Sequence, residues 1–309
     1  MDLAEENRDG TIVHRHTKEL WSVQIDLLKK LLEVCSKHNL KIWAEAGTLL
    51  GAVRHKGYIP WDDDIDMMMF RDDYEKLLKI SSEEFEHPYF LQAASTEPGY
   101  IRGHAQFRRS DTTGILPNDI FQSFNQGIFI DIFVFDFLPE NEEERVEVFR
   151  ELESRRSRLY NRNYFLPYTL KGLLQKYQDY FHYRHKGIFH AFKQMESLIL
   201  EFPRKSKSLV GNVMWTTHNY HKFVRNIEWY ETTVMLPFED LMIPAPKEFD
   251  KVLTAQYGDY MKPVKAPSCH GEIIVDINTP YTETLKKMRA EVNWKTKIKR
   301  FVTPGPATN

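Results

Sequence analysis

The sequence has little cysteine, with Cys35 and Cys269 as the two thiols in a chain of 309 residues. Two cysteines cannot build the dense disulfide framework of small secreted domains, so a reducing compartment is the simpler interpretation. The chain also lacks an apolar run near the ~20 residues that span a bilayer. Its acidic, polar N-terminus lacks the apolar core of a signal peptide. We therefore expect a cytoplasmic protein.

Neither sign of charge dominates the chain. The 42 Lys and Arg residues nearly balance the 44 Asp and Glu residues, which gives a net charge of -2 and a pI of about 6.6. Without a global basic field, the composition does not point to a nucleic-acid partner. The hydrophobic content of 42% is enough for one large domain or two modest ones with a core.

Helical and strand patterns are both present and predict an α+β fold. Apolar residues recur at helical spacing over residues 17–38, and Asn39 is a plausible stop. Further helices are expected over 47–55, 71–80, 140–161, 169–201 and 247–257. Strands are expected over 40–46, 63–70 and 127–135, with shorter strands over 89–115 and 203–246.

Four aspartates lie within five positions: Asp62, Asp63, Asp64 and Asp66. On a strand over 63–70, Asp64 and Asp66 would share one face, with Cα atoms roughly 6–7 Å apart. Two carboxylates at this spacing can reach one divalent cation, and oxygen ligands favour Mg²⁺ or Mn²⁺. A solvated acidic turn is the alternative, but such turns rarely continue into an apolar strand.

A third acid lies in the segment GIFIDIFVFD, residues 127–136. Alternation along a strand places Asp131 on the same face as Phe133 and Phe135. A charge in the middle of such a strand is costly to bury without a metal or a cationic partner. Asp131 is therefore a candidate third metal ligand, whereas Asp136 at the strand end is expected to be a cap or turn residue.

Gly47 and Thr48 stand where the strand over 40–46 gives way to a helix. Gly47 permits close backbone approach, Thr48 adds a hydroxyl, and the free N–H groups of a helix N-terminus suit a phosphate. Arg54 follows about two turns later and could clamp a phosphate with two hydrogen bonds. A surface ion pair between Arg54 and one of the aspartates is the alternative.

These parts, in this order, resemble the nucleotidyltransferase superfold, with its Gly-Ser/Thr turn, its Asp-x-Asp strand and its third acid on a neighbouring strand. The segment GTLLGAVRHKGYIPWDDDID is similar to the hallmark of the LicD family of phosphocholine transferases, which includes fukutin and fukutin-related protein. Later blocks resemble the same family: RRSDTT (108–113), FIDIF (129–133), LPFEDLMIPAPKEFDKVL (236–253) and YGDYMKP (257–263). The resemblance covers about 20–270 and is weakest over 140–235.

The resemblance implies a nucleotidyltransferase-like mixed sheet flanked by helices, with a helical insertion. The organisation we predict is a leader (1–16), a catalytic core (17–139), a helical insertion (140–202), the C-terminal part of the LicD-like domain (203–285) and a basic tail (286–309).

The implied activity is Mg²⁺- or Mn²⁺-dependent transfer of a phospho-alcohol, with phosphocholine favoured, from a CDP-linked donor. The acceptor would be a hydroxyl of a cell-surface glycan, such as teichoic acid or lipopolysaccharide, or of its lipid-linked precursor. Asp64, Asp66 and Asp131 would bind the metal, and Asp62 would act as general base or hold the loop. Substrate contacts are expected from Glu45, Gly47, Thr48, Arg54, His55, Trp61, Arg108 and His270.

Two other functions remain open. A nucleotidyltransferase that places a nucleoside monophosphate on a small alcohol or sugar would use the same acids, but it would release pyrophosphate rather than CMP. An inactive glycan-binding homologue would be expected to lack an acid of the metal triad, and all three acids are present.

Two ligand contacts also remain open. A choline headgroup would need an aromatic face, and the candidates are Trp43, Tyr58, Trp61, Trp215, Tyr220 and Trp229. The basic stretch 286–302, in which apolar residues are interleaved, fits either a peripheral membrane contact or a solvated helix with a frayed tail.

Overall fold

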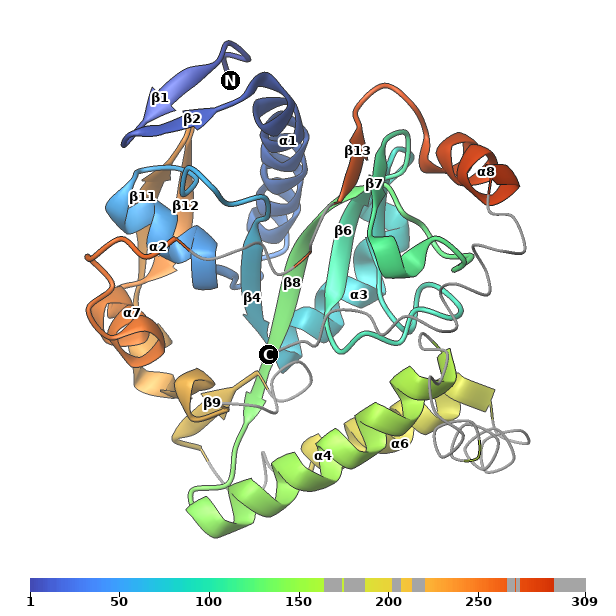
Figure 1. Ribbon diagram of the computed structural model, residues 1–309. Helices are drawn as coiled ribbons and strands as arrows, with labels where there is room; N and C mark the ends of the chain where they lie inside the picture. The colour runs from blue at the N-terminus through green and yellow to red at the C-terminus, as the bar shows by residue number, and fades with distance from the viewer. Residues whose placement is uncertain are drawn as a thin grey trace.

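The computed structural model describes residues 1–163, 174, 187–201, 207–212, 220–265, 270 and 273–291. Within these residues, seven strands form one mixed sheet in which β8 is central (Figure 1). The sheet strands are β3 (Trp43–Ala44), β4 (Asp66–Phe70), β5 (Tyr89–Gln92), β6 (Ala105–Arg109), β8 (Ile128–Phe137), β9 (Leu209–Gly211) and β10 (Val224–Asn226). The α+β class is confirmed.

Strand β8 organises the sheet because three strands pair with it. β4 runs parallel to β8, whereas β6 and β9 run antiparallel to it. Its sequence of β-branched and aromatic residues suits a strand whose two faces are both covered. Three strand pairs lie outside this sheet: β1 (Glu6–Arg8) with β2 (Thr11–Val13), β11 (Thr233–Phe238) with β12 (Leu241–Pro246), and β7 (Thr113–Ile115) with β13 (Ile274–Asp276).

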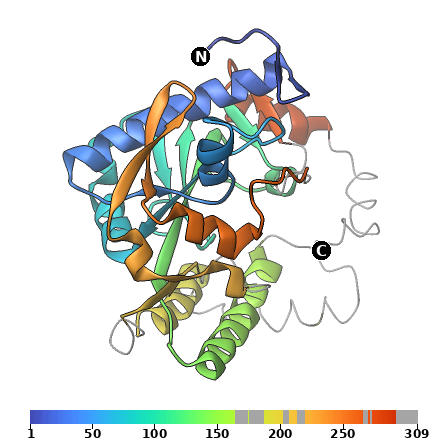
Figure 2. The same cartoon turned by 90° about the vertical axis from the view of Figure 1, so that its left-hand side faces the viewer.

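The described helices are α1 (Arg15–Lys37), α2 (Ala46–Arg54), α3 (Arg71–Glu84), α4 (Glu142–Asn163), α6 (Gly187–Ile199), α7 (Phe249–Tyr257) and α8 (Tyr281–Glu291). Helix α1 buries a stripe that includes Leu27, Leu28 and Leu31, and it packs against β8 and β6. It stops as predicted at Asn39, whose φ of 54° lies in the left-handed region. Figure 2 shows α7 and the β11–β12 hairpin in front of the sheet.

Two predicted strands are shorter than expected, and this corrects the argument about Asp64. Trp43–Ala44 replaces the strand over 40–46, and β4 starts at Asp66 rather than at residue 63. The indole Nε1 of Trp21 donates to the carbonyl of Asp62 at 3.0 Å, and Gln24 Nε2 donates to the carbonyl of Asp63 at 2.8 Å. Because α1 binds these carbonyls, the segment before β4 is a loop, and Asp64 shares no strand face with Asp66.

The first residues are not the loose leader that was expected. Strands β1 and β2 form a hairpin, and Arg8 on β1 pairs with Glu239, with 3.2 Å between Nη2 and Oε2. The guanidinium of Arg8 also lies 5.1 Å from the ring centroid of Trp21, within cation–π range. These contacts hold the hairpin against α1 and the β11–β12 turn.

Helices α4 and α6 lie side by side along the lower edge of the molecule in Figure 1 and form a second apolar cluster. A buried ion pair ties this cluster to the sheet. Arg71 binds Asp136 on β8 through two bonds of 2.8 and 2.7 Å, and its Nη1 lies 2.8 Å from Glu196 on α6. Asp136 is therefore an ion-pair partner rather than the expected cap. Much of the helical stretch predicted over 169–201 lies outside the described residues.

Helix α8 contains the first residues of the predicted basic tail. Leu285 is buried next to Ile115 and Ile120, and Arg289 donates to the carbonyls of Ile120 and Gln122 at 2.7 and 2.6 Å. This part of the tail is therefore packed on the body of the protein, and residues 292–309 lie outside the described part. None of the described helices combines the length and the apolar character that crossing a membrane requires.

Candidate active site

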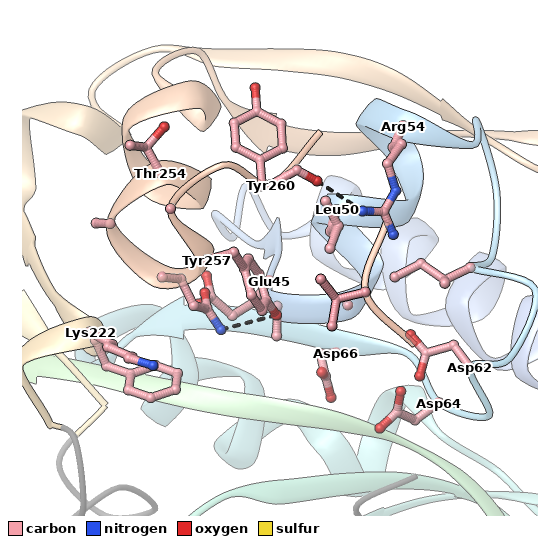
Figure 3. Close-up of a pocket in the computed structure, with 18 of the residues that line it drawn as sticks. Glu45, Leu50, Arg54, Asp62, Asp64, Asp66, Lys222, Thr254, Tyr257 and Tyr260 are labelled. Atoms are coloured by element: carbon pink, nitrogen blue, oxygen red, sulfur yellow. Dashed lines mark hydrogen bonds between the residues drawn. The ribbon is translucent and has the colours of Figure 1, made fainter. Parts of the chain in front are cut away.

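A cavity of about 840 Å³ lies where β4 and β8 meet the start of α2 and the end of α7 (Figure 3). Acids line one part of it: Asp62, Asp64, Asp66, Asp131 and Glu45. Aromatic side chains line much of the remainder: Trp61, Phe133, Phe135, Phe223, Tyr257 and Tyr260. Arg54, Lys222, Lys262 and His270 contribute positive or titratable groups. Five of the predicted acids therefore come together in one cavity.

The strand pairing of β4 and β8 places Asp66 beside Asp131. Their Cα atoms are register partners in the parallel ladder, and the N–H of Asp131 donates to the carbonyl of Ile65 at 2.8 Å. Neighbouring strands lie about 4.8 Å apart. Because both residues line the cavity, the two carboxylates face it as immediate neighbours.

The Gly47–Thr48 turn helps to position Asp62 and Asp66. The Thr48 hydroxyl oxygen accepts a hydrogen bond from the N–H of Asp66 at 2.8 Å, and Thr48 is buried. A Cβ atom at Gly47 would lie 2.5 Å from Oδ2 of Asp62, so glycine leaves the room that this carboxylate occupies. In the described structure, Thr48 therefore positions Asp66 and is absent from the cavity wall, while Gly47 accommodates Asp62.

Asp131 is held as a carboxylate by donors on and next to β6. Gln106 Nε2 donates to its Oδ1 at 2.8 Å, and His104 Nε2 lies 3.2 Å from the same oxygen. Burial alone would raise the pKa of Asp131, but His104, His270 and Gln106 outweigh it and lower the pKa to about 2. Asp131 is therefore negatively charged across the physiological range.

The other three acids lack comparable compensation. Burial raises the pKa of Asp62, and it raises the pKa of Asp64 and Asp66 well above the ordinary value. Repulsion adds to burial: the charge of Asp62 acts on Asp64, and those of Asp64 and Asp131 act on Asp66. The cavity thus concentrates more negative charge than its own cations neutralise.

His270 lies among these acids. Its Nδ1 is 3.4 Å from Asp64, and its Nε2 is 3.8 Å from Asp131. Burial alone would lower the pKa of His270, but Asp63, Asp64 and Asp131 raise it to about 9. An imidazolium between the carboxylates provides the counter-charge that this cluster needs.

One member of the predicted metal triad, Asp64, belongs to a cluster of potential ligand atoms. Among the described residues, potential ligand atoms that lie within 4.8 Å of one another belong to Asp63, Asp64 and His270. Asp66 and Asp131 lie next to this group, and His270 stands between Asp64 and Asp131. Buried carboxylates with raised pKa values are the groups that a divalent cation stabilises, so the donor set fits Mg²⁺ or Mn²⁺.

The sequence comparison agrees with this arrangement. Residues 39–170 match the family model described as LicD/FKTN/FKRP, nucleotidyltransferase domain. The matched residues include the Gly47–Thr48 turn and the aspartates that line the cavity, so the chain is similar to the LicD family in the part that holds the candidate site. It is 25% identical over 251 residues to the lipopolysaccharide cholinephosphotransferase LicD of Haemophilus influenzae, covering 79% of this chain and 91% of that protein.

Two shorter matches of this chain are to uncharacterised proteins. One, from Rickettsia prowazekii, is 50% identical over 54 residues, which is 18% of this chain and 20% of that protein. The other, from Rickettsia typhi, is 53% identical over 47 residues, which is 15% of each chain. Both relatives are uncharacterised, so these matches carry no statement about activity.

Two of the predicted substrate contacts, Arg108 and His55, lie away from the cavity. Arg108 is fully buried, donates to Gly127 O at 2.6 Å and binds Gln106 Oε1, and burial lowers its pKa to about 10. It therefore orients Gln106, the donor to Asp131, and does not face a phosphate. The His55 ring pairs with Asp9, 2.6 Å from Nδ1, and accepts a bond from Arg54.

Arg54 and Trp61 do reach the cavity wall. Arg54 Nη1 donates to the carbonyl of Tyr260 at 2.8 Å, which fixes its guanidinium at the rim in Figure 3. Among the described contacts, Arg54 forms no ion pair with any of the four clustered aspartates, which was the alternative considered for it. Of the aromatic candidates for a choline face, Trp61 lines the cavity, Trp43 and Tyr58 are buried in the core, and Trp215 lies outside the described residues.

Sequence reasoning missed the residues that hold the acids in place. Trp21 and Gln24 fix the acidic loop, and His104 and Gln106 fix Asp131. Gln106 is a polar residue within strand β6, and this position could have marked it as a partner of Asp131, which lies opposite it in the strand pairing. The contribution of α1 had no such signal, because it depends on how the helix packs on the sheet.

Proposed function

We propose that this protein transfers phosphocholine from CDP-choline to a hydroxyl of a cell-surface glycan or its lipid-linked precursor. The observation that carries the proposal is the gathering of Asp62, Asp64, Asp66 and Asp131 in one cavity wall that is large enough for a nucleotide-linked donor. The similarity to a lipopolysaccharide cholinephosphotransferase supports the choice of phosphocholine and of a glycan acceptor.

In this proposal Asp64, Asp66 and Asp131 would bind Mg²⁺ or Mn²⁺, taking over the counter-charge that His270 supplies among them. When bound, the cation would neutralise the charge that develops on the departing CMP. Arg54, at the rim, would donate to a phosphate oxygen, as its planar guanidinium suits this contact.

The acceptor hydroxyl would attack the choline-bearing phosphorus. A new P–O bond to the glycan forms, the bond to the CMP oxygen breaks, and the hydroxyl proton passes to a base. We assign this role to Asp62, because its pKa is raised by burial and its carboxylate lines the cavity beside Gly47. Positioning and electrostatic stabilisation would supply most of the rate.

The first experiment is a thermal-shift panel with Mg²⁺ and CDP-choline, CDP-ethanolamine, CDP-glycerol or CDP-ribitol. A ligand that binds the native state raises the melting temperature, and CDP-choline is expected to do so most. Product analysis follows: transfer releases CMP from CDP-choline, whereas a nucleotidyltransferase would release pyrophosphate from a nucleoside triphosphate. Absence of Mg²⁺-dependent CMP release with a lipopolysaccharide acceptor would count against the proposal.

A further inference from the structure

Glu45 is a buried carboxylate that faces the cavity without a hydrogen-bond partner among the described residues. It is 3% exposed, and neither of its carboxylate oxygens accepts a hydrogen bond. The closest cation is Arg225, whose Nη2 lies 3.9 Å from Oε1, beyond hydrogen-bond range. A buried, poorly compensated carboxylate is costly, so a ligand group is the missing partner that its position indicates.

Arg225 lies close enough for a long ion pair with Glu45 but does not supply a hydrogen bond, and both of its Nη atoms donate to other groups. Its Nη2 donates to Gln256 Oε1 at 3.1 Å, and its Nη1 donates to the carbonyl of Lys222. Arg225 is also fully buried behind the cavity wall rather than in it. Glu45 therefore presents its carboxyl group to the cavity, next to Tyr257 in Figure 3.

The cavity that Glu45 faces is rich in aromatic side chains. Phe133 and Phe135 follow Asp131 on the same face of β8, and Phe223 and Tyr257 line the cavity as well. A quaternary ammonium carries a positive charge but has no N–H or O–H to donate. A carboxylate combined with aromatic faces matches that chemistry, whereas a sugar hydroxyl or a base amino group would be better served by a polar wall.

The distance along β8 from the acids to the aromatic residues matches the short chain that joins the phosphate of phosphocholine to its ammonium group. Phe133 is two residues beyond Asp131, which is roughly 6–7 Å along a strand. Glu45 is next to Asp66, because its N–H donates to the carbonyl of Asp66 at 3.0 Å. A phosphate held at the acids would therefore place a group that is two carbons away beside Glu45 and Phe133.

We propose that Glu45, Phe133 and Phe135 form a subsite for the quaternary ammonium group of the donor. This inference rests on the proposed function, which places the donor phosphates at the four aspartates. The subsite selects choline because its cationic headgroup neutralises the charge of Glu45, which the uncharged alcohol part of glycerol or ribitol phosphate does not do.

The test is calorimetric binding in Mg²⁺ of four ligands: CDP-choline, CDP-glycerol, CMP and phosphocholine. Glu45→Gln should weaken the binding of CDP-choline and phosphocholine by about tenfold or more, and Phe133→Leu should weaken it by about fivefold. CMP and CDP-glycerol should stay within about twofold of wild type. Asp259→Asn is the matched control, because it removes one carboxylate from the exposed rim of the same cavity. It should leave the ratio of CDP-choline to CDP-glycerol affinity unchanged.

Two results would overturn the subsite. One is an equal loss of CMP and CDP-choline affinity in Glu45→Gln, which would mean that Glu45 contacts the nucleotide. The other is tighter binding of CDP-glycerol than of CDP-choline by the wild-type protein. This result would reject the subsite but not transfer from a CDP-linked donor. Conversely, binding of phosphocholine that depends on Glu45, without binding of any cytidine nucleotide, would keep the subsite and reject the proposed donor. Circular dichroism checks folding, and Phe133→Leu with Phe135→Leu carries the test if Glu45→Gln does not fold.

Discussion

Asp66 and Asp131 occupy opposite positions on two adjacent parallel strands, 65 residues apart in the chain and paired in register. The ladder of β4 and β8 fixes their backbones, so the closeness of the two carboxylates is a property of the sheet and not of flexible side chains. Two buried carboxylates held together in this way raise the energy of the metal-free protein. A cation between them would lower it.

Asp66→Asn tests this relationship through both stability and activity. Because burial and the neighbouring carboxylates raise the pKa of Asp66, removal of its charge should raise the melting temperature of the metal-free protein by about 2 °C or more. The same change should lower Mg²⁺-dependent turnover roughly 10²- to 10³-fold. Thermal melts with and without Mg²⁺, together with CMP release, provide the measurement. Unchanged turnover in a folded variant would remove Asp66 from the site.

The acids themselves could be predicted from sequence, because their type and order along the chain reflect the chemistry. The placement of Asp64 could not. Strand alternation assigns it to β4, but Trp21 and Gln24 on α1 bind the preceding carbonyls and keep that segment a loop. Arg108 is predicted to contact the substrate for a related reason: a sequence shows the charge of a guanidinium but not that Gln106 and Gly127 already bind it.

The mixed sheet followed from patterns that are strong and local, such as the β-branched and aromatic run of β8. The hairpin of β1 and β2 had a weaker pattern, and its stability depends on Arg8 reaching Glu239 far along the chain. Long-range ion pairs of this kind leave no periodic signal. The same holds for Asp136, which a local pattern assigns to a turn and which the fold pairs with Arg71.

Thr48→Val should separate positioning from binding. Valine keeps the shape of threonine but removes the oxygen that accepts the N–H of Asp66, so a buried donor is left unpaired. We expect a loss of about 1–3 kcal/mol in the free energy of unfolding and a fall in kcat with little change in the KM for CDP-choline. Thr48→Ser keeps the hydroxyl and should retain most of both. A Thr48→Val variant with normal kcat and a raised KM would instead indicate direct contact with the donor.

Cys35 should make stability depend on alkaline pH. Burial, aided by the charge of Asp73, raises the pKa of its thiol from 9.0 to about 12 in the folded state. Because the folded-state pKa is the higher one, this contribution is complete below pH 9 and is lost as the pH rises toward 12. At pH 10.5 the loss is up to about 2 kcal/mol, at about 1.4 kcal/mol per pH unit.

The measurement compares urea unfolding of wild type and Cys35→Ala at pH 8 and pH 10.5 in the presence of reductant. Buried tyrosines such as Tyr58 and Tyr230 add a slope that both proteins share. At pH 8 the variant should have a lower free energy of unfolding than wild type, because it loses packing. Between pH 8 and pH 10.5, however, its free energy of unfolding should fall by less than that of wild type. Parallel losses in the two proteins would show that Cys35 does not titrate in this range.

Arg71→Met tests the buried ion pairs that connect the sheet to the α4–α6 pair. The substitution removes both bonds to Asp136 and one to Glu196, while Glu196 keeps the Nζ of Lys193 at 2.7 Å. Asp136 is then a buried carboxylate without its partner, and we expect a loss of about 3–5 kcal/mol in the free energy of unfolding. Turnover well below the melting temperature should change little, because Arg71 does not line the cavity in the described structure.

The double variant Arg71→Met, Asp136→Leu distinguishes a lost attraction from a stranded charge. An apolar pair in place of a buried ion pair is often neutral or stabilising, so adding Asp136→Leu should recover most of the stability that Arg71→Met loses. Urea denaturation of the two single variants and the double variant gives the coupling energy. If the double variant is as unstable as Arg71→Met, the guanidinium stabilises the protein mainly through its contact with Glu196 on α6 rather than through Asp136 on β8.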